Sequence, residues 1–434
     1  MEPAFSNAGP KATPTSRRIV LTTVGSLGDL HPYIAIALGL RARGHEAILA
    51  TSECYRRKVE ALGLGFRAVR PDSDCVRDPD RMQRFMNPRL GTVRFVREVL
   101  LPVLRESYED ISAATRGADL LVSHMPWAAR LVAEKTGIPW ASTMITPLGF
   151  FSTYDLPVFP LAPAASKKLR CLGPSFWGPL FRFGKWATRP WAKPFYRLRA
   201  ELGLPSTNEW NPLGDSHSPA LVLALFSKRL ADKQPDWPPQ TVITGFPFYD
   251  QDGGSGLPPA LVHFLDDGPP PIVFTLGISA AMVAGSFYEH SIAAAKLLGR
   301  RAVLITGDNP RNQPASLPVG MAAFDYAPFS ELFPRAAVIV HAGGIGTTGL
   351  AMRSGRPILV VPHSHDQPDN AARVSRLGIA RTIPPRRYTP TRVAAELQEL
   401  LTEPAYAQRA MEISGQIRQE DGVQMACDAL DRFL

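Results

Sequence analysis

Short apolar, β-branched runs alternate along this chain with stretches of helical spacing. The run at residues 18–23 is followed by a glycine-rich turn, an apolar stretch with helical spacing at 33–43 and a second strand-like run at 44–51. Gly44 stands where the C-terminal glycine of that helix is expected. This order of strand, loop, helix and strand predicts a βαβ unit.

The same pattern returns and then starts again in the second half. The segment at residues 271–282 repeats the apolar strand and small-residue turn of residues 19–29. We therefore predict an α/β protein with two similar halves, each a doubly wound parallel sheet. The other strand-like runs lie at residues 119–123, 139–143, 220–226, 302–307, 321–326, 336–344 and 357–362.

The length of 434 residues suggests two domains. Residues 250–259 (DQDGGSGLPP) have the composition of a linker. The expected organisation is a disordered tail at 1–16, a first domain at 17–250, a linker at 251–258, a second domain at 259–414 and an amphipathic final helix at 415–434.

Composition indicates an ordinary globular protein, with 45% apolar and 20% charged residues. No export signal and no apolar run of about 18 residues is seen, so we expect a cytoplasmic protein without a membrane span. The cysteines are far apart and read as reduced thiols rather than a disulfide framework or a metal site. They are Cys54, Cys75, Cys171 and Cys427.

The charge of +9 is concentrated in residues 162–200, which hold nine Lys or Arg and no acid. Residues 157–194 are also rich in Pro, Phe and Trp and show no clean period, so we expect a surface loop with short helices. Three interpretations stay open: a solvated basic excursion, a lid over an acceptor, and a peripheral contact with the inner membrane face. No nucleic-acid-binding motif accompanies the cations, and we expect no nucleic-acid partner.

The strongest chemical signal is the stretch after the strand that ends at His341. Glycines let the backbone approach a bulky group, and the start of the following helix offers unpaired N–H donors and a positive dipole end. Together they predict a phosphate site, to which Thr347 and Thr348 add hydroxyls and His341 an imidazole. The alternative is a dinucleotide-dependent oxidoreductase, since Gly344, Gly346 and Gly349 spell GxGxxG, although the next strand lacks the closing acid.

Two further polar segments lie after predicted strands. Asp366 and Gln367 can accept from and donate to hydroxyl groups, which suits a hexose attached to the diphosphate; the alternative is a capped loop before a helix at Ala371. Asp29 and His31 follow the first strand, at the edge where α/β proteins bind ligands. Either is a candidate general base, and Asp29 is equally a candidate helix N-cap before Pro32.

These motifs, in this order, resemble glycosyltransferases of family one with the GT-B fold: the bacterial sterol, macrolide and rhamnolipid-type enzymes, distantly related to plant UDP-sugar glycosyltransferases. The resemblance covers residues 18–434. It rests on GS-x-GD-x-x-P (Gly25, Ser26, Gly28, Asp29, Pro32), on H-x-GG-x-GTT (His341 to Thr348) and on Asp366 with Gln367.

The resemblance implies two Rossmann-like domains facing a cleft, with the acceptor on the first, the nucleotide sugar on the second and the final helix crossing back to the first. It implies inverting transfer without metal or cofactor, by a monomer or dimer, with Asp29 as the base. The implied donor-binding residues are Gly28, Gly277, Ser279, Tyr326, Ala327, His341, Gly343, Gly344, Gly346, Thr347, Thr348, Asp366 and Gln367.

Two departures from the plant enzymes concern the nucleoside. Tyr326 replaces a tryptophan that stacks on uracil, and Gly349 replaces a ribose-binding glutamate. We expect UDP-glucose as donor, with a dTDP-sugar transferase acting on a lipid, for example a rhamnosyltransferase, and a non-catalytic sugar-nucleotide binder as alternatives. An apolar acceptor is expected against aromatic residues, and the candidates are Trp127, Phe150 and Phe151.

Overall fold

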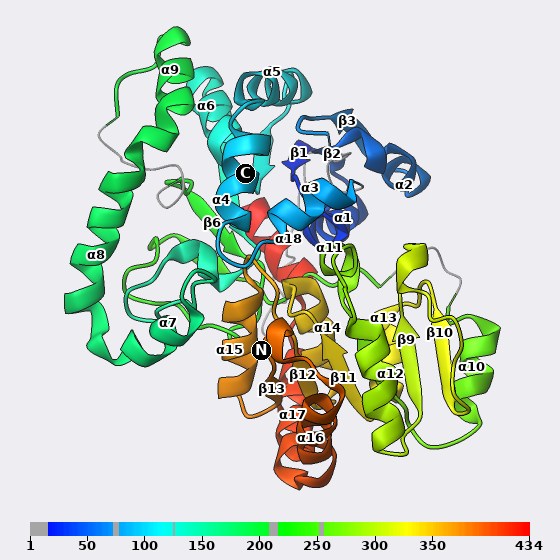
Figure 1. Cartoon of the computed structure of the whole chain (residues 1–434). Helices are drawn as coiled ribbons and strands as arrows, with labels where there is room; N and C mark the ends of the chain where they lie inside the picture. Colours follow the sequence, from blue (N-terminus) through cyan, green and yellow to red (C-terminus); the bar gives the residue numbers. More distant parts are fainter. Residues whose placement is uncertain (1–15, 73–77, 125, 208–215, 251–255) are drawn as a thin grey trace, which may run out of the picture.

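The computed structural model describes residues 16–72, 78–124, 126–207, 216–250 and 256–434. Its strands form a seven-stranded sheet of order β3-β2-β1-β4-β5-β6-β7 and a six-stranded sheet of order β10-β9-β8-β11-β12-β13. The strands in both sheets pair in parallel, with helices on both faces (Figure 1). The predicted fold class, two doubly wound α/β domains, is confirmed.

The first sheet reverses its winding between β1 and β4, which are neighbours, and this is the point where such sheets bind ligands. Its strands are β1 (Arg18–Thr22), β2 (Glu46–Thr51), β3 (Gly65–Ala68), β4 (Leu120–Ser123), β5 (Trp140–Met144), β6 (Leu221–Ala224) and β7 (Thr241–Ile243). The helices before the basic segment are α1 (Leu27–Ala42), α2 (Arg56–Ala61), α3 (Pro79–Phe85), α4 (Gly91–Phe95), α5 (Leu104–Ala114) and α6 (Pro126–Thr136).

The second sheet has the same switch between β8 and β11. Its strands are β8 (Ile272–Thr275), β9 (Ala302–Ile305), β10 (Met321–Phe324), β11 (Val338–His341), β12 (Ile358–Val360) and β13 (Ala380–Thr382). Its helices are α10 (Pro259–Asp266), α11 (Gly277–Ala281), α12 (Phe287–Leu297), α13 (Phe329–Leu332), α14 (Ile345–Ser354), α15 (Gln367–Arg376) and α16 (Pro390–Thr402).

The last two helices, α17 (Pro404–Ile417) and α18 (Gly422–Phe433), carry the chain back to the first domain. A Cβ at Gly39 of α1 would lie 2.6 Å from the Val423 side chain and 2.9 Å from Cys427 Sγ of α18, so only glycine permits this packing. The single helix expected at 415–434 is thus two helices with a break between them. Most of the expected tail and linker lies outside the described residues, and the exact domain boundaries stay a prediction.

Three helices begin earlier than the sequence pattern indicates. Helix α1 begins at Leu27 rather than at residue 33, because Ser26 is its N-cap and Pro32 is accommodated inside it. The carbonyl left without a donor by Pro32 is that of Gly28, in the exposed first turn, where water or a ligand can satisfy it. Helix α14 likewise begins inside the glycine loop, and α15 begins four residues before Ala371.

The surface loop with short helices expected at residues 157–194 is instead mainly helical, and one of its helices is longer than expected. It forms α7 (Pro163–Leu169), α8 (Gly173–Thr188) and the start of α9 (Lys193–Glu201), joined by short 3₁₀ turns, and α8 lies on the outer flank of the first domain (Figure 1). Trp177 of α8 is buried whereas Phe176 and Phe183 are exposed. Apolar residues on both the inner and outer side of α8 hide the helical period.

Candidate active site

Three glycine turns meet where the carboxyl ends of the two sheets face each other. A Cβ on Gly346, in the first turn of α14, would lie 3.9 Å from Gly28 Cα, in the first turn of α1. A Cβ on Gly277, which has φ of +68°, would lie 3.8 Å from Thr347 Oγ1. The structure therefore brings the turns after β1, β8 and β11 together, although they are far apart in sequence.

His341 is the last residue of β11 and is fully buried. Its Nδ1 accepts the backbone N–H of Gly343 at 2.9 Å, which places the ring proton on Nε2. Burial lowers the pKa of His341 to about 3, so the ring is neutral at pH 7. Nε2 is buried and has no hydrogen-bond partner in the part of the chain that the structure describes. A buried N–H without an acceptor, beside a helix N-terminus, is suited to bind an anion.

The helix start beside His341 offers its backbone amides, with Gly344 as the N-cap of α14. Thr348, expected to bind the diphosphate, is fully buried and donates its hydroxyl to the Gly344 carbonyl at 2.9 Å. Its hydroxyl therefore serves the helix, which corrects that expectation. Thr347 is half-buried and is the hydroxyl that faces Gly277.

The first turn of α15 is hydrogen-bonded to this glycine loop. Asn370 donates to the Gly343 carbonyl at 2.9 Å and to Asp366 Oδ2 at 2.7 Å. The side-chain carbonyl oxygen of Gln367, Oε1, accepts the backbone N–H groups of His363 (2.8 Å) and Ser364 (3.2 Å). The Gln367 carbonyl is thus occupied, and its amide nitrogen is the group that can serve a ligand hydroxyl.

Asp366 and Asp29 come from different domains and lie close enough to repel each other. Burial raises the pKa of Asp366 to about 7, with a further increase from the charges of Asp29 and Asp369, while the hydrogen bond from Asn370 opposes it. The electrostatic interaction indicates that the candidate sugar-binding carboxylate lies near the candidate base.

Asp29 is the third residue of α1, and its Oδ2 accepts from the backbone N–H (2.7 Å) and the hydroxyl (3.0 Å) of Ser26. It is therefore the far partner of a capping box rather than the N-cap, which corrects that alternative. Burial raises the pKa of Asp29, whereas the nearby His124 lowers it. The other candidate base, His31, has its ring 5.2 Å from that of Tyr249. Residues two apart on a helix point to different sides, so the side chains of the two candidate bases, Asp29 and His31, point in different directions.

His124 is a site residue that the sequence analysis missed. It directly follows β4, its backbone N–H donates to the Thr22 carbonyl of β1 at 2.9 Å, and burial lowers its pKa while Asp29 raises it. Its Nδ1 is buried without a hydrogen-bond partner among the described residues. The signal in the sequence was a polar residue directly after the strand-like run at residues 119–123.

The residues expected to lie near the nucleoside differ in exposure and packing. Tyr326 follows β10 and is 51% exposed, so its ring is accessible to a base, whereas Ala327 is buried. Ser279 is half-buried in α11. Gly349 packs against Phe246, because a Cβ there would lie 3.0 Å from that ring. The position of the ribose-binding glutamate of the plant enzymes thus faces an apolar ring and carries no acid in this chain.

The aromatic residues expected to bind the acceptor lie in different surroundings. Trp127 is 6% exposed and belongs to the hydrophobic core, which assigns it a packing role. Phe150 stacks on Trp237 at 3.9 Å between ring centroids. Phe150 and Phe151 line a cavity of about 1080 Å³ that extends under α8 to residues preceding β5, β6 and β7. Their acceptor role stays a prediction.

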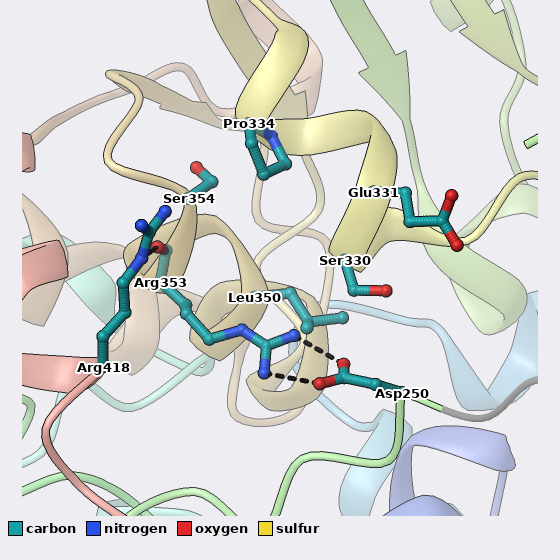
Figure 2. A pocket seen from close by; sticks show the side chains of 8 residues that line it. All are labelled: Asp250, Ser330, Glu331, Pro334, Leu350, Arg353, Ser354 and Arg418. Atoms are coloured by element: carbon teal, nitrogen blue, oxygen red, sulfur yellow. Dashed lines mark hydrogen bonds and ion pairs between the residues drawn. The ribbon is translucent and has the colours of Figure 1, made fainter. Parts of the chain in front are cut away.

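A smaller cavity, of about 380 Å³, lies beside the middle and end of α14, away from its N-terminus (Figure 2). Arg353 of α14 donates two hydrogen bonds to Asp250, at 2.8 and 2.5 Å, and Arg418 Nε donates to the Arg353 carbonyl. Since Arg353 is paired with Asp250 and Arg418 is hydrogen-bonded to the Arg353 carbonyl, we do not assign an anion site to this cavity.

Within the described ranges, no group of three or more His, Cys, Asp or Glu side chains is placed to hold a metal ion. Nor does any helix in those ranges have the length and apolar character to cross a bilayer.

Comparison with known proteins decides the family. Residues 19–147 match the model of the glycosyltransferase family 28 N-terminal domain, and residues 292–423 match the erythromycin biosynthesis protein CIII-like C-terminal domain. The chain is 33% identical over 428 residues to O-mycaminosyltylonolide 6-deoxyallosyltransferase of Streptomyces fradiae, covering 96% of this chain and 97% of that protein. This chain belongs to that glycosyltransferase family. The oxidoreductase alternative is therefore wrong.

Some more distant relatives are much longer than this chain. The sterol 3-beta-glucosyltransferase of Cryptococcus neoformans is 29% identical over 453 residues, which cover 97% of this chain but 27% of that protein. Two solved structures share the GT-B fold. They are the glycosyltransferase of kitacinnamycin (TM-score 0.68, 24% identity, 97% of this chain and 100% of that chain) and VinC in complex with dTDP (TM-score 0.66, 19% identity, 96% and 99%).

Proposed function

We propose that this glycosyltransferase transfers a hexose from a nucleoside-diphosphate sugar to a hydroxyl of an apolar small molecule, with inversion and without a metal. The observation that carries the proposal is the buried Nε2–H of His341 beside the N-terminus of α14, facing the turn that holds Asp29. His341 and the start of α14 would supply a diphosphate site on the second domain, and Asp29 would supply a base on the first domain.

In the proposed step, Asp29 accepts the proton of the acceptor hydroxyl as that oxygen attacks the anomeric carbon. The bond from the anomeric carbon to the diphosphate oxygen breaks, and the negative charge develops next to the His341 Nε2–H and the amides that begin α14. A base in this role contributes typically about 10²–10⁴-fold. His124 is a positioning residue that favours the ionised form of Asp29.

Asp366 and the amide of Gln367 would hold the sugar hydroxyls, since both lie at the start of α15, under the glycine loop. The repulsion between Asp29 and Asp366 supports a sugar bound between them, because its hydroxyls would separate and solvate the two carboxylates.

The donor nucleotide has two candidates. UDP-glucose is the donor expected from the sequence. A dTDP-hexose is favoured by the contact of Gly349 with Phe246, because an apolar ring at the position of the ribose-binding acid suits a sugar without a 2′-hydroxyl. The similar structure that holds dTDP supports the second candidate, and the name of the 6-deoxyallosyltransferase supports a deoxyhexose as the sugar. The relatives' names also suggest a macrolide-like or sterol acceptor.

Calorimetric titration with UDP, dUDP and dTDP separates these candidates. If the absence of a ribose-binding acid at Gly349 determines the donor preference, dUDP and dTDP should bind more tightly than UDP. Tighter binding of UDP than of dUDP would instead favour a ribonucleotide donor. Mass spectrometry of reactions with UDP-glucose, dTDP-glucose and dTDP-rhamnose, against macrolide, sterol, polyphenol and lipid acceptors, identifies the product. Donor binding without transfer to any acceptor would favour the non-catalytic binder.

A further inference from the structure

Helix α8 presents large apolar side chains to the outside of the molecule. Phe176 (47% exposed), Leu180 (44%), Phe183 (60%) and Trp186 (60%) follow at spacings of four, three and three residues, which places them along one side of the helix. With Leu172 (44%) just before α8, they are called here the outer face of α8.

The outer face differs from the rest of the described surface. Seven of the fifteen large apolar residues that are strongly exposed in the described ranges lie between Leu161 and Trp186. The opposite side of α8 is anchored, since Trp177 is buried and donates its indole N–H to the Leu169 carbonyl at 3.0 Å, and its ring packs near Phe181. The exposed side is therefore displayed by a helix that is held in place.

The surroundings of the outer face are positive. Residues 162–200 contain nine Lys or Arg and no Asp or Glu. Lys167, Lys168 and Arg182 are exposed. Apolar and aromatic side chains interleaved with cations are the pattern of helices that lie in the interface of an anionic bilayer.

We propose that the outer face of α8 docks this enzyme on the surface of an anionic lipid membrane. The helix has 16 residues, about 24 Å, and contains Pro179, Arg182 and Lys185, so it would lie along the surface. Its place on the flank of the molecule, on the other side from β9 and β10, leaves it accessible to a flat surface (Figure 1).

A second copy of the chain is the less favoured occupant. A two-fold symmetric contact would set the same patch against itself, so the exposed cations Lys167, Lys168 and Arg182 would face their own copies. An anionic bilayer instead complements both features, since its lipid headgroups attract the cations and its acyl boundary takes up the rings.

Co-sedimentation with vesicles tests the proposal on the full chain. We expect binding to mixed phosphatidylcholine and phosphatidylglycerol vesicles, at least about tenfold weaker binding to pure phosphatidylcholine, and loss of binding at about 1 M salt. The triple variant Phe176→Ser, Phe183→Ser, Trp186→Ser should bind anionic vesicles at least about tenfold more weakly. The control Leu297→Ser, which alters a residue 61% exposed in the other domain, should bind as the wild type does.

A separate charge variant, Lys167→Glu with Lys168→Glu and Arg182→Glu, should also lose vesicle binding. Each variant must retain the wild-type affinity for the nucleoside diphosphate, which shows that the enzyme is folded. Equal binding of the wild type and the triple variant, or no binding to anionic vesicles, overturns the proposal. So does a dimer in light scattering that the triple variant dissociates, because a second copy then covers this face. Vesicle binding is measured without turnover, so its outcome is independent of the proposed reaction.

Discussion

Asp369, in the helix that begins with the Asp-Gln pair, accepts a hydrogen bond from the backbone N–H of Val158 in the other domain at 2.8 Å. Its second oxygen accepts from Arg373 Nε at 2.7 Å, and the Arg373 guanidinium also pairs with Asp155. Asp369 and Arg373 are 0% and 2% exposed. This buried ion cluster ties α15, which carries the candidate sugar-binding residues, to the first domain. It lies next to the start of the α7–α8 region, because Asp155 also pairs with Arg170.

Replacing Arg373 with methionine should lower the free energy of unfolding by about 3–5 kcal/mol, because the fully buried Asp369 carboxylate loses its counter-ion, whereas Asp155 keeps Arg170 and Arg376. The matched control is Arg376→Met on the same helix. Arg376 is 40% exposed and reaches Asp155 only at 3.5 Å, so its loss should cost about 1 kcal/mol or less. Urea unfolding at neutral pH measures both, and similar effects for the two arginines would contradict the coupling described here.

Asp29→Asn should reduce kcat by about 10²–10⁴-fold, because an amide cannot accept the acceptor's proton. Affinity for the nucleoside diphosphate should stay near the wild-type value, since the base lies on the other domain from His341. Steady-state kinetics and calorimetry check the two parts. Wild-type turnover in Asp29→Asn, together with inactive His31→Ala, would transfer the role to His31.

His124→Phe should move the acid limb of the kcat/KM profile to higher pH. Burial raises the pKa of Asp29 and His124 lowers it. Without His124 the pKa of Asp29 should therefore be higher, and Asp29 should become protonated at a higher pH. A purely structural role would lower activity at all pH values without moving the limb. His263→Phe, an exposed histidine of α10, provides the control.

The central strands of both sheets could be predicted because burial on both faces gives continuous apolar runs. The edge strands β3, β7 and β13 were missed. Their sequences, GFRA, TVI and ART, are short, and two of them contain an arginine, since one side of an edge strand contacts solvent. No local pattern distinguishes such segments from loops.

The site could be predicted where its chemistry is local in sequence. The glycine loop after His341, the Asp366 pair and Asp29 each follow a strand and lie together as expected. His124 and the buried hydroxyl of Thr348 could not be assigned, because their roles depend on neighbours: Asp29 beside the first and the Gly344 carbonyl beside the second. The acceptor aromatics could not be assigned from the sequence either, since a Phe or Trp looks the same in sequence whether it lies in a core, as Trp127 does, or in a pocket, as Phe151 does.

His341→Ala should weaken nucleoside-diphosphate binding by about 10–100-fold, the loss of one hydrogen bond to a charged group. Because burial keeps the pKa of His341 near 3, its contribution should not change between about pH 5 and pH 8. Calorimetry at both values measures this. A wild-type affinity that falls steeply with pH, and a variant that loses that slope, would mean that the ring binds as a cation.

Asp366→Asn should remove part of the pH dependence of stability. The pKa of Asp366 is about 7 in the folded enzyme against an ordinary value of 3.8, so the folded state holds a proton that the unfolded state has released between these values. Its contribution is therefore fully present below about pH 4 and is lost as pH rises towards 7, by at most about 1.4 kcal/mol per pH unit.

An asparagine does not ionise, and its amide oxygen can still accept from Asn370. In urea unfolding, the variant should gain stability relative to the wild type between about pH 5 and pH 8, whereas Asp267→Asn, at an exposed site, should not. A constant difference across this range would show that Asp366 is ionised throughout, and its burial would then be offset by a partner other than Asn370.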